Sequence, residues 1–303
     1  MSEGGFPGLD GYLRAEMAKV EAALHRALDA LEDDLRPDVL EATRHGVLGG
    51  GKRLRPILCV AAYVACDGEA TEDAYDLATS LELIHAYSLM HDDLPCMDDA
   101  ELRRGRATTH RVHGELLTMT AGAALIPAAA RQALHSATAL GCEGPRARRV
   151  ASLVMEAAGA GGMVGGQWLD LLGEDAHLEP EELDALHGMK TGALLATSLV
   201  VGATAAGASD DVREALGAYG RAIGLAFQIA DDILDATASA EALGKNPSDA
   251  DLGKSTYVAL YGLEPARAQA DALVHQALTA LEEAGVVSAP LEALARYVVE
   301  RGR

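Results

Sequence analysis

Two clusters of aspartates carry the side chains best suited to chemistry in this chain. The first lies at residues 92–99 and the second at residues 231–235, and each follows apolar residues with helical spacing. Carboxylates are costly to remove from water unless cations compensate them. Mg²⁺ prefers carboxylate oxygens and shares its coordination with waters and substrate phosphates. The two clusters therefore predict an Mg²⁺ site that accepts a phosphorylated substrate.

The spacing within each cluster predicts different local structures. Asp231 and Asp235 are four residues apart, which places both carboxylates on one face of a helix. Asp92 and Asp98 are six residues apart and would diverge on a straight helix, while Pro95 is a poor residue for a helix interior. We expect the helix to bulge or end at residues 94–97, so that Asp92 and Asp98 converge.

Cationic residues accompany the aspartates in a pattern that suits phosphate. Residues 49–56 read Gly-Gly-Gly-Lys-Arg-Leu-Arg-Pro, so Lys52 and Arg55 share a face at a helix start. Arg103 and Arg104 directly follow the first cluster and are suited to bidentate phosphate contacts. The alternatives are a glycine turn with solvated charges at residues 49–56 and arginines that only neutralise neighbouring acids. Further cations and hydroxyls lie at Lys190, Thr191, Lys245, Lys254 and Thr256.

Composition limits the kind of partner. The formal charge of the 303 residues is −21, which argues against nucleic acid or an anionic membrane surface. The four cysteines lack metal-ligand spacing and are interpreted as small buried residues of a reducing compartment. The N-terminal residues lack the pattern of a signal peptide, and no charge-free run of about twenty apolar residues occurs. We expect a cytoplasmic protein without membrane insertion.

Helical periodicity extends over nearly the whole chain. Ala, Leu and Glu are frequent, aromatic residues make up 4%, and no alternating strand pattern, repeat or linker is found. The sequence predicts one all-α domain, residues 1–303. The expected helices cover residues 9–32, 36–46, 53–66, 71–92, 114–138, 145–172, 179–206, 209–238, 255–284 and 288–301.

These residues resemble the trans-prenyl diphosphate synthases over nearly the whole chain. Residues 82–99, followed by Leu-Arg103-Arg104-Gly, look like the first aspartate-rich motif of that family. The other matching segments, in family order, are residues 50–56, Gly165-Gly-Gln167, residues 227–235, Leu-Gly-Lys245 and residues 254–257. With the C-terminal residues 297–301, the likeness is greatest to bacterial farnesyl diphosphate synthases. The resemblance implies a helical bundle around a central cavity, of the isoprenoid synthase type, and a homodimer.

The resemblance also implies residue roles. Mg²⁺ ions would bridge an allylic diphosphate to Asp92, Asp98, Asp231 and Asp235. Isopentenyl diphosphate would bind Lys52, Arg55, His85 and Arg104. Groups that assist the allylic diphosphate or line its site would be Arg103, Lys190, Thr191, Phe227, Gln228 and Lys245. The implied reaction joins isopentenyl diphosphate to dimethylallyl or geranyl diphosphate, with the proton lost to the departing diphosphate. His91 and Phe227 can equally be packing residues.

Product length depends on Tyr87, five residues before Asp92 and so about 7.5 Å along a helix. In this family an aromatic residue there, with the first cluster two residues longer, resembles bacterial producers of farnesyl diphosphate. The alternative is that Tyr87 only packs and that Ser88, Ala123 or Ala124 leave room for geranylgeranyl diphosphate. The chain also departs from the family pattern: Ala123 replaces a usual Asp, and His113 stands where an aromatic is common.

Two other functional hypotheses remain open. A class I terpene cyclase would share the first cluster, but it typically carries an Asn/Asp, Ser/Thr and Glu triad where this chain has three aspartates. It would also have no need of Lys52 and Arg55 for a second diphosphate. An inactive partner subunit tends to lose acidic or cationic positions, which this chain keeps.

Overall fold

The computed structural model describes residues 8–173, 178–237 and 256–300, and these residues are almost entirely helical. The first half contains α1 (Leu9–Asp29), α2 (Pro37–Val47), α3 (Leu54–Ala65), α4 (Glu72–Asp92), β1 (Leu102–Arg103), β2 (Arg106–Ala107), α5 (Thr109–His113), α6 (Glu115–Ala139) and α7 (Gly144–Ala158). The second half contains α8 (Met163–Gly173), α9 (Pro180–His187), a π-helical segment (Gly188–Gly192), α10 (Ala193–Ala206), α11 (Asp210–Thr237), α13 (Tyr257–Tyr261), α14 (Leu263–Glu283) and α15 (Ala289–Glu300). The all-α prediction is confirmed.

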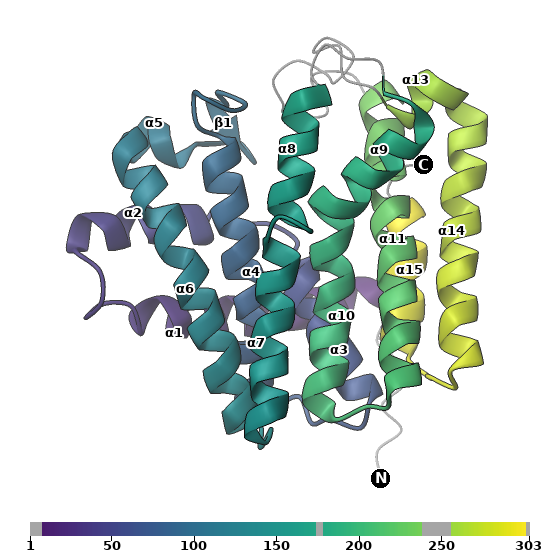
Figure 1. Ribbon diagram of the computed structural model, residues 1–303, viewed down its shortest axis with the longest axis horizontal. Coiled ribbons are helices and arrows are strands. Elements are labelled where there is room, and N and C mark those ends of the chain that lie inside the picture. Colours follow the sequence, from purple (N-terminus) through teal and green to yellow (C-terminus); the bar gives the residue numbers. More distant parts are fainter. Residues whose placement is uncertain (1–7, 174–177, 238–255, 301–303) are drawn as a thin grey trace.

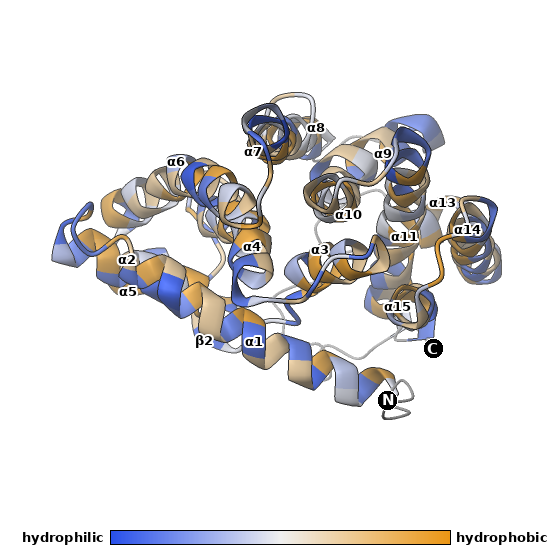
Figure 2. Cartoon of the chain, turned by 90° about the horizontal axis from the view of Figure 1, so that it is seen from below, coloured by the Kyte–Doolittle hydropathy of each residue, from blue (hydrophilic) through white to orange (hydrophobic). Residues whose placement is uncertain are grey.

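The long helices stand side by side in one bundle (Figure 1). The closest pairs are α4 with α6, α11 with α14, and α10 with both α3 and α11. Viewed from below, α1 runs along one edge of the bundle, beside the standing helices and roughly perpendicular to them (Figure 2). Leu24, Leu58, Leu81, Leu125 and Leu199 are fully buried between these elements, and burial of such side chains stabilises the fold. The core is thus shared by helices from both halves of the chain.

This arrangement brings the two acidic clusters to the same end of the bundle. Helix α4 ends beside the β1–β2 hairpin, and α11 ends beside α9 and α13 (Figure 1). The second acidic cluster occupies the last turns of α11, and the first begins at the end of α4.

Three of the expected helices are interrupted. Residues 145–172 form α7 and α8, separated at Gly159–Gly162, where a Cβ on Gly162 would lie 2.2 Å from the carbonyl oxygen of Ala157. The segment 179–206 changes to π-helical geometry at Gly188–Gly192. Within 255–284, Gly262 adopts φ +84° and ends α13 before α14 begins. Each interruption contains glycine, which adopts tight or left-handed backbone geometry at little steric cost.

The sequence pattern missed the hairpin and α5. Arg104 and Gly105 both have positive φ, as in the two-residue type I′ turn, and they connect β1 to β2 with Arg103 opposite Arg106. Two-residue strands are too short for a periodic signal. All four cysteines are free thiols, but only Cys59 and Cys142 are buried as predicted. Cys66 is half-buried, and Cys96 is exposed in the turn after α4.

One stretch of the described chain, Pro180–Ala206, is long and apolar enough to pass a simple test for a membrane span. In the fold it comprises α9, the π-helical segment and α10, and most of its apolar window is buried against other helices. A buried core helix passes the same test, so this stretch is accounted for by its packing.

Candidate active site

The first acidic cluster is shaped by the end of α4. The helix stops at Asp92, as predicted, and the chain then folds back in a tight turn. The amide of Asp98 donates to the carbonyl oxygen of Asp92 at 2.9 Å, and the amide of Asp99 donates to Leu94 at 3.1 Å. This turn brings Asp98 back to Asp92. Asp92 and Asp93 are buried, whereas Asp98 and Asp99 are exposed at the mouth of the site.

The buried carboxylates are electrostatically unfavourable without a cation. Burial, reinforced by Asp98 and Asp93 and opposed by Lys190 and Arg103, raises the pKa of Asp92 to about 6. Burial also raises the pKa of Asp93, despite its ion pair with Arg103 at 2.6 Å. A desolvated carboxylate beside a second acid suits a hard divalent cation, because the cation would compensate both the lost hydration and the repulsion between the two carboxylates. The donor set therefore fits Mg²⁺.

No three His, Cys, Asp or Glu side chains among the described residues are close enough to form a preassembled metal site.

The second acidic cluster differs from the first in how its members are used. Asp231 and Asp235 are half-buried on α11, whereas Asp232 is buried and its Oδ2 accepts from the amide of Tyr257 at 2.8 Å. Phe227 is half-buried and packs against the main core, and Nε2 of Gln228 lies 3.4 Å from Nδ1 of His187. Asp232 thus anchors the start of α13.

The allylic-side cations predicted from sequence lie on two different elements. Arg103 is on β1 and binds Asp93, and Lys190 is in the π-helical segment and donates to Asp170 at 2.5 Å. Both lower the pKa of Asp92 through their charge, so both lie near that carboxylate. Thr191 follows Lys190 in the same segment. Lys245, Lys254 and Arg301 lie outside the described residues.

The glycine-rich segment before α3 is held in place by Arg53. Its guanidinium is buried and donates to Glu82 at 2.7 Å, to Glu21 at 2.6 Å and to the carbonyl oxygen of Val47 at 2.9 Å. Arg53 also has φ +50° and directly precedes α3. These bonds tie the segment to α1 and α4, and so fix where Lys52 and Arg55 start.

A second group of cations gathers around this segment. Arg55 lies in the first turn of α3, and its buried Nε has no hydrogen-bond partner among the described residues. Burial, aided by Arg104 and opposed by Glu82, lowers the pKa of Arg55 to about 10. The pKa of His85 falls well below its usual value through burial and then through Arg55 and Arg104. Arg104 itself donates to the carbonyl oxygen of Gly50. Three of the four residues expected to bind isopentenyl diphosphate are therefore brought together.

Lys52, the fourth residue of that set, is exposed and lies over the ring of Tyr297 on α15, with Nζ 5.4 Å from the ring centroid. This cation–π contact connects the C-terminal helix to the glycine-rich segment. Sequence reasoning noted Tyr297 only as part of a C-terminal motif.

Other residues of the site were missed by sequence reasoning. Asp170 and His187 carried no spacing signal, because each acts through a partner distant in sequence. Gln167 was noted only within a motif; both polar atoms of its amide are buried without a hydrogen-bond partner in the described part of the chain. Gly166 packs so closely on Lys190 that a Cβ there would lie 2.1 Å from the backbone nitrogen of Lys190.

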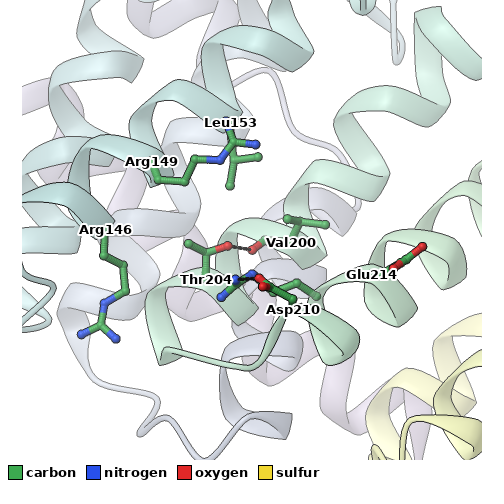
Figure 3. A pocket seen from close by; sticks show the side chains of 8 residues that line it. Arg146, Arg149, Leu153, Val200, Thr204, Asp210 and Glu214 are labelled. Carbon is green, nitrogen blue, oxygen red and sulfur yellow. Dashed lines mark hydrogen bonds and ion pairs between the residues drawn. The ribbon is translucent and has the colours of Figure 1, made fainter.

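A separate cavity of about 540 Å³ lies between α7, α10 and the start of α11. Figure 3 shows Arg149 and Leu153 on one side of it and Val200, Thr204 and Asp210 on the other. Arg149 already binds Glu156 at 2.7 Å, and Arg213 pairs with Asp210. This cavity is at the end of the bundle where α10 turns into α11, away from the acidic clusters (Figure 1). Its charges are largely compensated, so we assign it no substrate.

The all-α bundle with charged residues gathered at one end has the isoprenoid synthase fold of its structural relatives. Residues 36–293 match the family model described as polyprenyl synthetase. The chain therefore belongs to the polyprenyl synthetase family and is a prenyltransferase.

Individual relatives cover nearly the whole chain. It is 40% identical to a dimethylallyltranstransferase of Fischerella ambigua over 97% of this chain and 84% of the relative. It is 41% identical to geranylgeranyl pyrophosphate synthase 9 of Arabidopsis thaliana over 94% of this chain and 80% of the relative. Among solved structures, an FPP/GFPP synthase from Zymomonas mobilis is similar, with a TM-score of 0.80, 36% identity, and coverage of 95% of this chain and 98% of that one.

We predict that Asp92→Asn stabilises the metal-free protein at pH 8 while removing activity. A pKa raised from 3.8 to about 6 means that ionisation of Asp92 is less favourable in the folded chain. Protonated Asp92 therefore contributes to the free energy of unfolding below about pH 4, and this contribution is lost as the pH rises through about 6. Asn should therefore raise the unfolding free energy by at most about 3 kcal/mol at pH 8. Thermal melts with chelator at pH 4.5 and 8 measure this.

Asp33→Asn, at an exposed turn residue, is the control for loss of one negative charge from an acidic protein. An equal gain in both variants, or a gain for Asp92→Asn that is as large at pH 4.5, would contradict the assigned burial cost.

Proposed function

We propose that this protein is an Mg²⁺-dependent farnesyl diphosphate synthase that adds isopentenyl diphosphate to dimethylallyl and geranyl diphosphates. The observation that carries the proposal is the presence, at one end of the bundle, of two separate groups of charged residues that are each suited to a diphosphate. One is the carboxylate pair with Arg103 and Lys190, and the other is the cation group at Arg55, His85 and Arg104. A cyclase, with one diphosphate to bind, has no use for the second group.

The carboxylates of Asp92, Asp98, Asp231 and Asp235 would hold Mg²⁺. When bound, Mg²⁺ supplies positive charge to a departing diphosphate. Arg103 and Lys190 add fixed positive charge on the same side, which favours heterolysis of the allylic C–O bond. Lys245, outside the described residues, is proposed to do the same.

The cation group holds the second substrate for attack. Lys52, Arg55, His85 and Arg104 bind and orient isopentenyl diphosphate, so that its double bond faces the allylic carbon. Neutral His85 contributes a hydrogen bond rather than a charge, because its pKa lies well below the usual range through burial and neighbouring arginines. One C–O bond breaks, one C–C bond forms, and one proton is lost to the departed diphosphate, so no side-chain base is required.

The polar groups along α11 and the π-helical segment would complete the allylic side. Thr191 and Gln228 are proposed to donate hydrogen bonds near the reacting carbon and the diphosphate, and Phe227 to line the isoprenoid path. Water must be kept from the ionised substrate, and the apolar helix faces of the bundle serve that purpose.

The wild-type protein should condense isopentenyl diphosphate with both allylic substrates when Mg²⁺ is present, as measured by chromatography of the products. Asp231→Ala should lower turnover by several orders of magnitude, because it removes charge stabilisation of the leaving group. Lys52→Ala should mainly raise KM for isopentenyl diphosphate. Diphosphate release that does not require isopentenyl diphosphate would identify a cyclase, and no product with any divalent metal would identify an inactive partner subunit.

Product length is proposed to be set by Tyr87. Its half-buried ring packs against the core and meets His91 edge to face, with ring centroids 5.0 Å apart. His91 is seated on α6: Nε2 lies 3.1 Å from the carbonyl oxygen of Met119, and a Cβ on Gly122 would come within 2.5 Å of it. The ring of Tyr87 therefore packs against a histidine that is itself held by α6. Ala123 is exposed on α6, so its difference from the family pattern changes an outer face of the chain.

Tyr87→Ala should move the main product from farnesyl diphosphate to geranylgeranyl diphosphate or longer, because loss of the ring removes the floor under the growing chain. Chromatography of the dephosphorylated products measures this, with Tyr63→Ala, on α3 over Gly68, as the control. A wild type that already makes mostly geranylgeranyl diphosphate, the product named for one relative, would place the floor elsewhere. Unchanged products from Tyr87→Ala would likewise show that Tyr87 does not limit the length of the product.

We also propose that residues 1–303 form one domain, that the protein works in the cytoplasm and that it assembles as a homodimer. Support for the dimer comes from exposed apolar faces. Leu116 and Met119 share one face of α6, and Val164, Trp168 and Leu172 share one face of α8. A second copy would bury these side chains.

Light scattering should give a dimer for the wild type and a smaller species for the double variant Leu116→Glu/Trp168→Glu, because buried charges would oppose association. Val287→Glu, which alters an exposed apolar residue outside these faces, is the control. A monomeric wild type at assay concentration would reject the proposed assembly.

A further inference from the structure

The imidazole of His187, at the end of α9, lies between two parts of the active site without belonging to either predicted motif. Its Nδ1 faces Nε2 of Gln228 at 3.4 Å, and its ring stacks on Tyr257 with centroids 5.8 Å apart and planes inclined by 24°. Burial lowers the pKa of His187 to about 4, so the ring is neutral at pH 7. With Gln228 donating to Nδ1, the single proton belongs on Nε2.

Tyr257 gives His187 a rigid surface to pack on. The hydroxyl of Tyr257 donates to Asp184 on α9, and its amide donates to Asp232 at 2.8 Å. Thr256 caps the same short helix by accepting from the amide of Ala259 at 3.1 Å. The aromatic ring is therefore fixed from α9 and from α11 at once.

The chain directly after His187 carries the allylic-side cation. Residues Gly188–Gly192 are π-helical and include Lys190 and Thr191. The segment has little room to move: a Cβ on Gly166 would lie 2.1 Å from the nitrogen of Lys190, and one on Gly224 would lie 2.9 Å from Cα of Gly192. π-Helical turns occur often at functional sites. His187 is the residue directly before this closely packed segment.

We propose that His187 is a positioning residue that couples Gln228 and the second acidic cluster to Lys190 and Thr191. Its hydrogen bond orients the Gln228 amide, and its stacking contact fixes the entry to the π-helical segment. The inference rests on the proposed function, because it assigns His187 to the allylic side of that same site. It also predicts independence from the Arg55 group, which is built on α3, α4 and the hairpin.

The test compares His187→Leu with His187→Asn. Leu fills the space but cannot accept from Gln228, whereas Asn offers a polar atom near the position of Nδ1. His187→Leu should lower kcat roughly 10- to 100-fold, the scale of a misplacement of about 1 Å, and should leave KM for isopentenyl diphosphate within about twofold. Asn should recover most of that loss. His110→Asn is a matched control: in both His110 and His187 the Nε2 atom has no hydrogen-bond partner among the described residues, but Nδ1 of His110 contacts the hydroxyl of Thr108.

Two measurements on the metal-free protein separate positioning from stability and from catalysis. Long-range ¹H–¹⁵N NMR should show His187 as the neutral Nε2–H tautomer, and Gln228→Leu should abolish that preference. Thermal melts should show that His187→Leu and His187→Asn unfold within a few degrees of each other.

The outcomes are distinct. Equal kcat loss in the Leu and Asn variants, a loss that follows melting temperature, or an Nδ1–H tautomer would overturn the inference. A wild type without prenyl transfer activity would instead refute the proposed function. The tautomer measurement would still test the hydrogen bond from Gln228 to Nδ1 of His187.

Discussion

The active site depends on the hydrogen bond from the amide of Asp98 to the carbonyl oxygen of Asp92, which ends α4. A continuing helix would carry the aspartates apart and direct half of them into the core. The turn instead leaves Asp92 desolvated at the end of a buried helix and returns Asp98 to its mouth. It also sends the chain into the β1–β2 hairpin, whose Arg103 pairs with Asp93. One helix end thus generates both the acidic group and its first cation.

Some charged groups at this end are paired within the protein, and others lie beside groups of the same charge. Arg53 is fully paired with Glu21 and Glu82, and it serves as the fixed point of the glycine-rich segment. Arg55 and His85, by contrast, face other cations, and Asp92 faces Asp98. Buried groups of this kind lower the stability of the free protein. These unfavourable placements are explained if substrate phosphates neutralise the cations and Mg²⁺ neutralises the carboxylates. The free protein is then less stable, but it binds substrate and metal more tightly.

The spacing of charged residues predicted the local geometry of the acidic clusters but not the residues packed around them. Asp231 and Asp235 share a face by helix geometry alone, and Pro95 predicted the end of α4. The π-helical segment could not be predicted, because its geometry depends on Gly166 and Gly224, which approach from α8 and α11. The roles of His187 and Asp170 were likewise invisible, since each contact joins residues at least twenty positions apart. The two-residue strands and α5 were too short to leave a periodic pattern.

The second acidic cluster illustrates why three aspartates follow one another there. Positions 231 and 235 face the same way, but position 232 is turned by about 100° on a helix of 3.6 residues per turn. Its carboxylate therefore points elsewhere, and in this fold it is used by the amide of Tyr257. Tyr257 in turn stacks on His187 and bonds Asp184. The motif thus combines two positions: Asp231 and Asp235 share a half-buried face of α11, where they are proposed to hold Mg²⁺, and Asp232 holds the start of α13 through Tyr257.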